Sequence, residues 1–553
     1  MSDDGRLRET QASFDVRWYD IDLQIDPACH RIEGRVIVRA LAQRPLAQLD
    51  LDLDSRLTVK AVTCERAGAD AIPLQFLHEG GRLLIQLQET VDTGAMVSVA
   101  VYYEGQPKVS SNPPFDGGFV WAHTKAGADW VGVCVQSGGA QLWWPCKAHP
   151  SDKPEDGMSL SFTAPGALVV VSNGRLDSVD LLADGQRRWR WTVSYPINSY
   201  NVTLYAAPYV ELSAEYFGLD GQQIPFSFFV LPEDSHDAGR VLPELVKHLS
   251  FLEETFGPYP FRGDKFAVVM SPYIGMEHQS AIAYGRAFDA RIMGFLWIAL
   301  HEAAHEWWGN MVAAENWRDF WLHEGFAKYT EALYAGHLHG QNAYHEYLAR
   351  FVRPQIKNDM SLAPRESHSI ESIAFDKIDP TRARRDPYAK GAMVLHTLRY
   401  LLGEDAFFEL LRRHAYPDAG ERDGRRVRLE SSDGFARRAK DVCGVDLTWF
   451  FEVYLRQKEL PRLRLERSLI ELRLRWETPS CLPFPMPIEL EIDGRRQRVI
   501  MPEFGETVIA TNGRNAVVDP DWWILRDDAP DPDCFGTLGL QAVSLDDAIK
   551  SGR

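Results

Sequence analysis

The stretch from Trp297 to Gly309 constrains the fold and the chemistry of this chain more than any other segment. It contains His301-Glu302-Ala303-Ala304-His305, an H-E-x-x-H pattern. Residues four apart lie on one face of an α-helix, so both imidazoles can reach one metal ion. The pattern therefore predicts a helix, near residues 295–308, that presents two metal ligands on the same face.

The coordination chemistry of zinc extends this prediction to two glutamates. Catalytic zinc sites take about three ligands from the protein and leave a fourth position for water. Glu324 can supply the third ligand, because Trp321–Ala327 opens the next predicted helix. Glu302 points roughly a quarter-turn away from the histidine face. It is therefore free to act as a general base toward a zinc-activated water, and one Zn²⁺ per chain is the expected cofactor.

The alternative is that H-E-x-x-H arises by chance on a charged helix, where the histidines are ordinary surface or core residues. The surrounding sequence disfavours this alternative, because the helix is largely apolar both before the motif and inside it. Burying two histidines and a glutamate in such surroundings is costly unless they are paired or bind a metal.

Length, charge and cysteine usage narrow the class of protein. A chain of 553 residues is too long for one hydrophobic core and suits three or four domains. The net charge of −18 argues against nucleic acids and anionic membranes as partners, because both need a basic surface. No run approaches the roughly 20 apolar residues of a membrane span. The seven cysteines are scattered without a C-x-x-C, so neither a disulfide framework nor a thiolate zinc site is expected.

The first residues, Met1–Arg6, are polar and acidic, and no signal-peptide apolar region follows them. A cytoplasmic protein is therefore expected, although an exported protein whose leader has been removed would look the same.

The spacing of apolar residues changes along the chain and divides it into regions. Two-residue alternation, as in Leu49–Leu53 and Val97–Val101, predicts a β-rich domain over 1–210. Residues 211–458 combine strands with helices and carry the metal motif. Short strands return over 459–527 and predict a small β-sandwich, and 528–553 is expected to be a loosely packed tail. The helical patterns in the middle region are predicted near 239–256, 326–338, 341–357, 388–402, 404–415 and 446–457.

Several segments resemble those of the aminopeptidase N family of gluzincin zinc metallopeptidases, which also contains the leukotriene hydrolases. The spacing of His301, Glu302, His305 and Glu324 matches the zinc motif of this family. Further resemblances are Trp321-Leu322-His323-Glu324-Gly325-Phe326-Ala327 to W-L-N-E-G-F-A, Ile274-Gly275-Met276-Glu277-His278 to G-x-M-E-N, and Tyr388-Ala389-Lys390-Gly391 to the segment that bears the catalytic tyrosine. The chain departs from the family at Ile274, His278 and His323, which leaves the shape of its subsites open.

The resemblance implies roles for further residues. Glu277 would bind the free α-ammonium group of a peptide, and Gln136 would share that amine through its carbonyl oxygen. Tyr388 would donate its hydroxyl to the oxyanion of the tetrahedral intermediate. Gly275 and Met276 would form part of the substrate-binding edge. The candidates for orienting the metal ligands are Glu331, Asp319 and Asn310, which are equally compatible with being solvated polar residues.

The implied architecture is a multidomain α+β protein. It has a β-rich N-terminal domain, a thermolysin-like α/β catalytic domain and a small C-terminal β-sandwich. The large helical C-terminal domain that many family members carry is not expected, because residues 528–553 are too few to form it.

The implied function is that of a zinc aminopeptidase, which removes the N-terminal residue from peptides with a free N-terminus. A zinc endopeptidase is the first alternative, and Glu277 disfavours it. An epoxide hydrolase is the second, and no lipid pocket is evident in the sequence. A non-catalytic zinc-containing peptide-binding protein is the third, and it is disfavoured by Glu302 and Tyr388. The sequence indicates neither an oligomeric state nor a preferred N-terminal side chain.

Overall fold

The computed structural model describes residues 5–65, 70–286, 288, 291–375, 383–418 and 420–527. The tail predicted over 528–553 lies outside the described residues. The chain divides into two compact units. The first comprises 1–317, 368–383 and 420–429, and the second comprises 318–367, 384–419 and 430–553.

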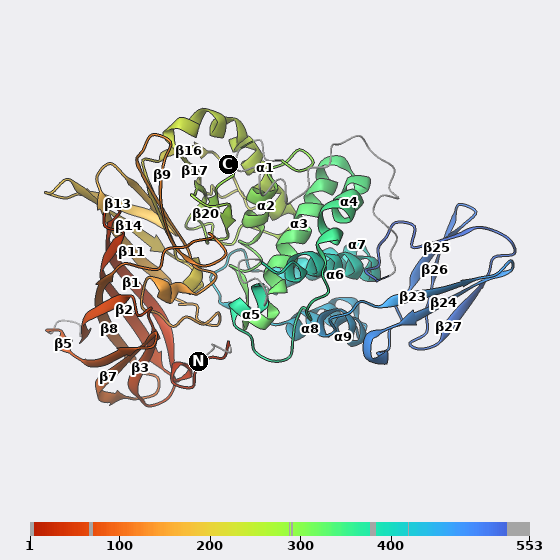
Figure 1. Ribbon diagram of the computed structural model, residues 1–553, viewed down its shortest axis with the longest axis horizontal. Coiled ribbons are helices and arrows are strands. Elements are labelled where there is room, and N and C mark those ends of the chain that lie inside the picture. Colours follow the sequence, from red (N-terminus) through yellow and green to blue (C-terminus); the bar gives the residue numbers. More distant parts are fainter. Residues whose placement is uncertain are drawn as a thin grey trace. The chain divides into compact units, whose positions relative to one another are not determined.

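A large, mostly antiparallel sheet forms the framework of the first unit (Figure 1). Its strand order is β13-β14-β11-β1-β2-β8-β4-β5, and β1 pairs in parallel only with β11. One face of β1, in the middle of the sheet, is buried in alternation, which is the two-residue periodicity of a half-buried strand. The strands are β1 (Phe14–Asp26), β2 (Arg31–Ala42), β4 (Leu57–Cys64), β5 (Ile72–Pro73), β8 (Met96–Gly105), β11 (Met158–Pro165), β13 (Arg175–Leu181) and β14 (Gln186–Val193).

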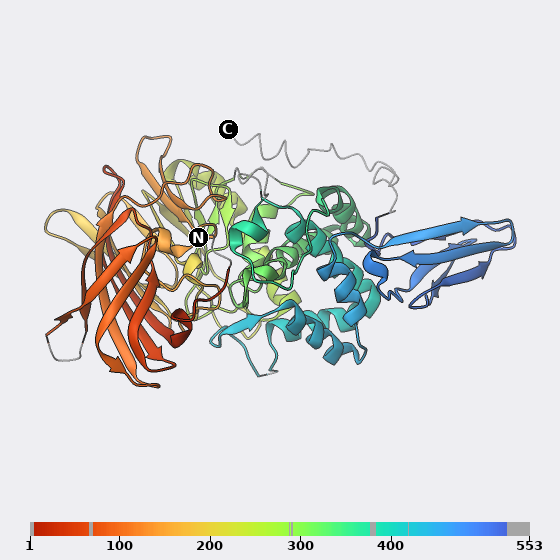
Figure 2. The same cartoon turned by 60° about the horizontal axis from the view of Figure 1, so that its bottom comes forward.

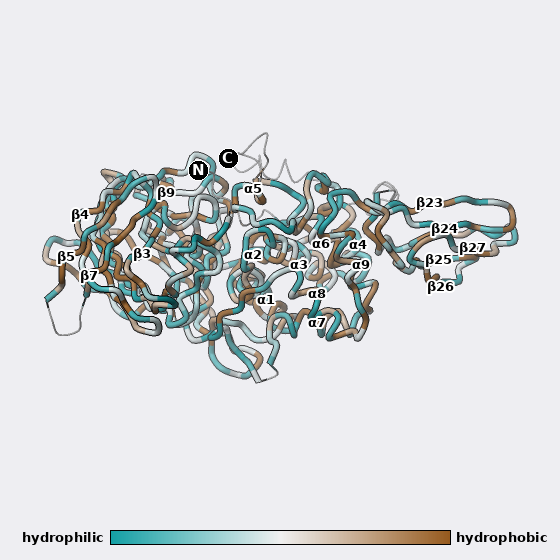
Figure 3. Tube along the Cα trace, turned by 90° about the horizontal axis from the view of Figure 1, so that it is seen from below, coloured by the Kyte–Doolittle hydropathy of each residue, from teal (hydrophilic) through white to brown (hydrophobic). Residues whose placement is uncertain are grey.

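Two smaller sheets complete the β-rich part of this unit. The three-stranded sheet contains alternating apolar and polar residues, as in Leu49–Asp52 of β3 (Figure 3), whereas the strands of the four-stranded sheet are mostly apolar. The three-stranded sheet contains β3 (Leu46–Asp52), β7 (Arg82–Val91) and β6 (Gln75–Glu79). The four-stranded sheet contains β12 (Val169–Ser172), β15 (Leu204–Ala207), β10 (Asp129–Cys134) and β9 (Gly118–His123). The largest side chains buried in this part include Tyr19, Tyr103, Trp143 and Trp144.

The same unit contains a five-stranded mixed sheet with the order β16-β17-β18-β20-β19. Its strands are β16 (Val210–Ala214), β17 (Phe226–Val230), β18 (Phe266–Met270), β20 (Ile282–Tyr284) and β19 (Gly275–Met276). The inner strands β17, β18 and β20 pair in parallel, and the short edge strand β19 is antiparallel to β20. The helices of this unit are α1 (Ser235–Phe256), α2 (Trp297–Ala304) and α5 (Ile370–Ala374).

Helices make up the first part of the second unit. They are α3 (Trp321–His339), α4 (Gln341–Tyr347), α6 (Asp386–Leu402), α7 (Glu404–Ala415), α8 (Ser432–Cys443) and α9 (Thr448–Arg456). The short strands β21 (Val312–Ala314) and β22 (Arg428–Glu430), which pair with each other, belong to the first unit except for Glu430.

Two three-stranded sheets follow the helices of the second unit (Figure 2). One has the order β23-β24-β27 and the other β26-β25-β28. Their strands are β23 (Arg462–Arg467), β24 (Glu471–Glu477), β25 (Ile488–Ile492), β26 (Arg495–Val499), β27 (Glu506–Ala510) and β28 (Ala516–Val518).

The multidomain prediction, with a β-rich N-terminal part and a helical region that carries the metal motif, is confirmed. Some helices differ from the prediction. The helix predicted over 341–357 ends at Tyr347 and continues as a π-helical turn, Leu348–Val352, and a 3₁₀ turn that contains Pro354. Helix α8 was not predicted. Among the described residues, no helix is long and apolar enough to cross a membrane.

Candidate metal centre and substrate-binding residues

The helix that carries the two histidines is short and is held at both ends. Helix α2 begins after Leu296, whose backbone N–H donates to Glu244 of α1 at 2.7 Å. The helix was predicted to end near residue 308, but it ends at Ala304. It ends earlier because the next turn is wider: the backbone N–H of Asn310 donates to the carbonyl of His305, five residues back, at 3.0 Å. His305 is therefore the first residue after the helix and still has helical backbone angles.

His301 and His305 direct their Nε2 atoms toward each other. The two nitrogens are 3.3 Å apart, and the ring planes are nearly perpendicular, at 82°. Both side chains are buried. The Nδ1 atom of His305 lies 2.8 Å from the carbonyl of Trp308. Because a carbonyl only accepts, Nδ1 carries the proton, and the lone pair of Nε2 is available to a metal.

This geometry fits a zinc ion. Two nitrogens held at about 2.0–2.1 Å from one tetrahedral ion lie about 3.3 Å apart, which is the separation between the two Nε2 atoms. The carbonyl that orients His305 is the kind of partner that fixes the tautomer of zinc-binding histidines. The two imidazoles could therefore supply two of the ligands that a zinc ion needs.

Glu302 lies against the edge strand of the mixed sheet. A Cβ atom built on Gly275 of β19 would lie 2.6 Å from Oε1 of Glu302 and 2.9 Å from Cγ2 of Ile298. Glycine at 275 is therefore required for the close approach of β19 to α2. This packing gives a physical reason for a glycine at position 275. The sequence analysis assigned Gly275 to the substrate-binding edge only from the family resemblance.

Glu277 follows β19 directly and is buried, with 3% of its surface exposed. The side-chain amide of Gln136 donates to its carboxylate, so these two predicted substrate-binding residues are in contact. One potential ligand atom from each of Glu277, Glu302 and His305 lies within 4.8 Å of the others. The structure therefore brings the predicted amine-binding carboxylate and the predicted base close to one of the metal-binding imidazoles.

Asn310 contacts the loop that contains Glu277. Its Nδ2 donates to the backbone carbonyl of Glu277 at 2.9 Å. Its own carbonyl accepts from the buried ammonium group of Lys153, and its Oδ1 accepts from Asn201. Burial lowers the pKa of Lys153 to about 7.

Glu306 is a site residue that the sequence analysis missed. Its carboxylate is fully buried, accepts from the backbone N–H of Ser280 at 2.9 Å and lies 3.0 Å from the hydroxyl of Tyr259. Burial raises the pKa of Glu306 to about 8, against the opposing effect of these hydrogen bonds and the charge of Lys265. The sequence did contain a signal for this buried role, because Glu306 is a charged residue beside two tryptophans in an apolar segment.

His278, which departs from the family pattern, is fully buried behind Glu277. Its Nδ1 lies 2.6 Å from the hydroxyl of Tyr205 on β15, and burial lowers its pKa to about 3. It is therefore a neutral packing residue of the loop, not a surface residue.

The remaining predicted catalytic residues belong to the second unit. Glu324 is buried in the first turn of α3, and Tyr388 is in the first turn of α6. The two helices touch at a pair of glycines: a Cβ on Gly391 would lie 2.9 Å from Cα of Gly325. Tyr388 also packs edge-on against Phe320, the residue before α3, with ring centroids 6.3 Å apart. The close crossing fixes Glu324 and Tyr388 relative to each other.

Two residues that were predicted to orient the metal ligands have clear partners within the second unit. Glu331 accepts from Lys328 at 2.8 Å and from the hydroxyl of Tyr347. Asp319 accepts from the backbone N–H and the hydroxyl of Ser432, at 3.1 and 2.5 Å, and so ties the start of α3 to the start of α8.

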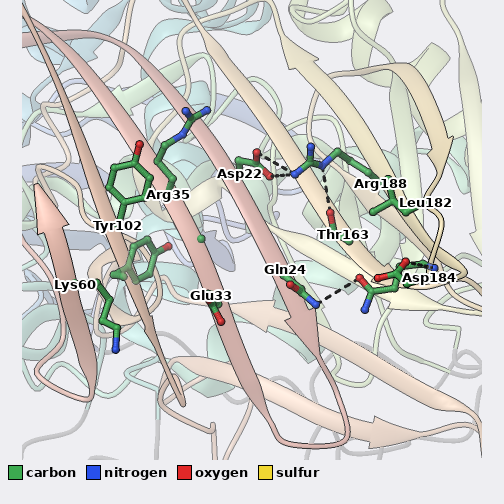
Figure 4. A pocket seen from close by; sticks show the side chains of 13 residues that line it. Asp22, Gln24, Glu33, Arg35, Lys60, Tyr102, Thr163, Leu182, Asp184 and Arg188 are labelled. Atoms are coloured by element: carbon green, nitrogen blue, oxygen red, sulfur yellow. Dashed lines mark hydrogen bonds and ion pairs between the residues drawn. The ribbon is translucent and has the colours of Figure 1, made fainter. Parts of the chain in front are cut away.

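A separate hollow lies on the polar face of the eight-stranded sheet (Figure 4). Its volume is about 650 Å³, and none of the residues that line it is a predicted site residue. Its charges are largely paired, as Arg188 with Asp22 at 3.0 Å and Lys60 with Glu104 at 2.7 Å. We interpret it as a solvated sheet face.

The helix with two facing imidazoles, the adjacent glutamate and the buried carboxylate at a sheet edge define the class of H-E-x-x-H metallopeptidases. Comparison with known families supports a narrower assignment. The Peptidase M1 N-terminal domain matches residues 16–201, and the Peptidase family M1 domain matches residues 242–419. The chain belongs to peptidase family M1.

Individual relatives agree with this assignment. The chain is 24% identical over 492 residues to endoplasmic reticulum aminopeptidase 1 of Homo sapiens, which covers 81% of the chain and 50% of that protein. It is 27% identical over 288 residues to aminopeptidase N of Streptomyces lividans, covering 48% of the chain and 32% of that protein. The chain therefore spans half or less of the length of these curated relatives.

A similar fold is known from the M1 zinc metallopeptidase of Deinococcus radiodurans. The TM-score is 0.65 at 22% sequence identity, and the match covers 81% of this chain and 96% of that one.

Proposed function

We propose that the protein is a zinc-dependent aminopeptidase that releases the N-terminal residue of peptides. The observation that carries this proposal is the arrangement within the first unit: two imidazole nitrogens 3.3 Å apart, with the carboxylates of Glu302 and Glu277 close to one of them. The pair of imidazoles alone fits any H-E-x-x-H hydrolase. The buried carboxylate of Glu277 fits a hydrolase that recognises the free N-terminus of a peptide.

His301, His305 and Glu324 would hold one zinc ion per chain, which follows from the spacing of the three residues in the sequence and the donor set that zinc prefers. Zinc in such a site lowers the pKa of water and polarises a carbonyl group. Through their hydrogen bonds, Glu331 and Asp319 would stabilise α3, the helix that carries Glu324.

The other roles follow from the chemistry of the side chains. Glu302 would take the proton of the attacking water and pass it to the leaving amine. Tyr388 would donate its hydroxyl hydrogen to the oxyanion that forms at the scissile carbonyl.

Selection of the chain end would come from Glu277. A free α-ammonium group can form a charge-assisted hydrogen bond to its carboxylate in a partly dry site, while the interior of a peptide offers no such cation. Gln136, which contacts the same carboxylate, would orient it or share the amine, and Met276 would line the same edge. The D. radiodurans metallopeptidase has also been solved with a Tyr-Ser-Ala substrate, a peptide of the kind proposed here.

The test is hydrolysis of a panel of fluorogenic amino-acid amides by zinc-loaded protein, beside the Glu302→Gln variant. The variant should lose at least about 10²-fold in turnover, since the general base is removed, and should keep its zinc. Unchanged turnover by Glu302→Gln would overturn the mechanism. Hydrolysis of peptides with blocked N-termini would favour the endopeptidase alternative.

A further inference from the structure

The loop that follows β19, residues 277–280, is held by hydrogen bonds at both of its ends. At one end, Nδ2 of Asn310 donates to the backbone carbonyl of Glu277 at 2.9 Å. At the other end, the backbone N–H of Ser280 donates to Oε1 of Glu306 at 2.9 Å. Nδ2 of Asn310 is also 3.5 Å from Oε1 of Glu306, so the two residues form one brace.

The middle of this loop is held from the β-rich part of the same unit. Nδ2 of Asn173 donates to the carbonyl of Gln279 at 2.7 Å. The backbone N–H of Gly174 donates to the hydroxyl of Ser280 at 2.9 Å. Ser280 itself has a left-handed backbone conformation, with φ of 58°. A residue other than glycine adopts this conformation only where its surroundings impose it.

The brace is covalently continuous with the metal helix. Glu306 follows His305 directly, and Asn310 N–H bonds to the carbonyl of His305 at 3.0 Å. The turn that ends α2 therefore carries both residues that hold the loop of Glu277.

Resting on the proposed function, we propose that Asn310 and Glu306 are positioning residues that set the spacing between Glu277 and His305. The distance between Glu277 and His305 would then determine which peptide bond is cleaved. The ammonium group of a substrate reaches Glu277 while its first carbonyl lies at the metal, so that only the terminal peptide bond is aligned. Misplacement by about 1 Å is enough to reduce such an alignment strongly.

The first test is the Asn310→Asp variant, which keeps the shape of the side chain and its acceptor oxygen but loses the Nδ2 donor. We expect kcat/KM for free-amine substrates to fall about tenfold, as for loss of one buried hydrogen bond, with zinc content unchanged. The preference for a free over an acetylated N-terminus should fall by a similar factor.

A matched control is Asn316→Asp. Nδ2 of Asn316 also donates to a backbone carbonyl, that of Gly5, at 2.8 Å, but away from the loop. This variant should leave kcat/KM unchanged. At the other end of the brace, Glu306→Gln keeps an acceptor for Ser280 and should retain the preference, while Glu306→Leu should lose it. If Asn310→Asp does not fold, the comparison of Glu306→Gln with Glu306→Leu tests the same proposal.

A binding measurement separates positioning from general damage. In the inactive Glu302→Gln protein, calorimetry gives the affinity for a dipeptide and for its acetylated form. Asn310→Asp should weaken binding of the free dipeptide about tenfold and leave the acetylated form unaffected. In a Glu277→Ala background, it should have no further effect.

Additive effects of Asn310→Asp and Glu277→Ala, or equal weakening of both ligands, would overturn the proposal while leaving the aminopeptidase assignment intact. Failure of the wild-type protein to hydrolyse any free-amine substrate would instead count against the proposed function.

Discussion

Tyr388 is the one proposed catalytic group in this chain that a sequence pattern alone would leave as an ordinary core tyrosine. It lies in the first turn of α6, and the ring of Phe320 packs against its edge. The ring contact with Phe320 does not involve the hydroxyl. Removal of the hydroxyl therefore tests catalysis with little effect on packing.

The Tyr388→Phe variant should lower kcat by about 10²–10³-fold, as expected for loss of one oxyanion donor, and should leave KM within about threefold. Thermal unfolding and zinc content are the controls and should match the wild type. A variant with wild-type kcat would remove Tyr388 from the mechanism.

Residue identity predicted the metal chemistry better than it predicted the supporting contacts. The pairing of His301 with His305 follows from a four-residue spacing on a helix, and the structure shows it. The buried role of Glu306 was missed because its partners, Ser280 and Tyr259, are distant in sequence. Such contacts depend on how strands and loops assemble, which local patterns do not contain.

The crossing of α3 and α6 is the main element-scale feature of the second unit. The Gly391→Ala variant would place a Cβ atom 2.9 Å from Cα of Gly325. The overpacking should cost about 1–3 kcal/mol, which exceeds the gain of about 1 kcal/mol in helix propensity. Chemical denaturation should therefore show a net loss of up to about 2 kcal/mol, together with reduced turnover.

The control for this prediction is Gly239→Ala in α1, where a Cβ atom would meet nothing within 4 Å. That variant should be stabilised by up to about 1 kcal/mol. Equal stabilisation of both variants would show that the helix crossing tolerates a methyl group.

Helix α1 carries a buried histidine that makes stability depend on pH. Burial, with a smaller effect from the charge of Arg291, lowers the pKa of His248 to about 3. An unfolded histidine titrates near 6.5. The stabilisation is therefore fully present above about pH 6.5 and is lost as the pH falls, because only the unfolded chain takes up the proton.

Between pH 7.5 and 5, His248 should remove about 2 kcal/mol from the free energy of unfolding. Denaturant titrations at both pH values should show that the His248→Leu variant lacks this share of the pH dependence, since all other titrating groups are common to both proteins. Parallel pH profiles for the two proteins would contradict this account of α1.

At the element scale, long periodic segments were predicted well and irregular ones were not. Helix α7 occupies Glu404–Ala415, as predicted from its amphipathic pattern. Helix α2 is shorter than predicted, because the turn after His305 widens to five-residue hydrogen bonds. Helix α8 was missed, although Ser431 caps its start by accepting from the N–H of Gly434 at 3.1 Å.

At the scale of the whole molecule, membership of peptidase family M1 agrees with the multidomain architecture expected from the changes in periodicity. The domain boundaries near residues 210 and 458 and the cytoplasmic location stay predictions. The chain spans half or less of the length of the curated relatives compared above, so its activity rests on its own site. The central claim is that this site combines a zinc ion with a carboxylate that recognises a free amine.

The most direct test of that claim is to identify, by mass spectrometry, the products that zinc-loaded protein forms from one short peptide and from the same peptide with an acetylated N-terminus. We predict stepwise release of the N-terminal amino acid from the free peptide, an intact acetylated peptide, and loss of all cleavage when a chelator removes the zinc, with recovery when zinc is restored. Internal cleavage of the acetylated peptide, or release that persists after the zinc has been stripped, would contradict the account.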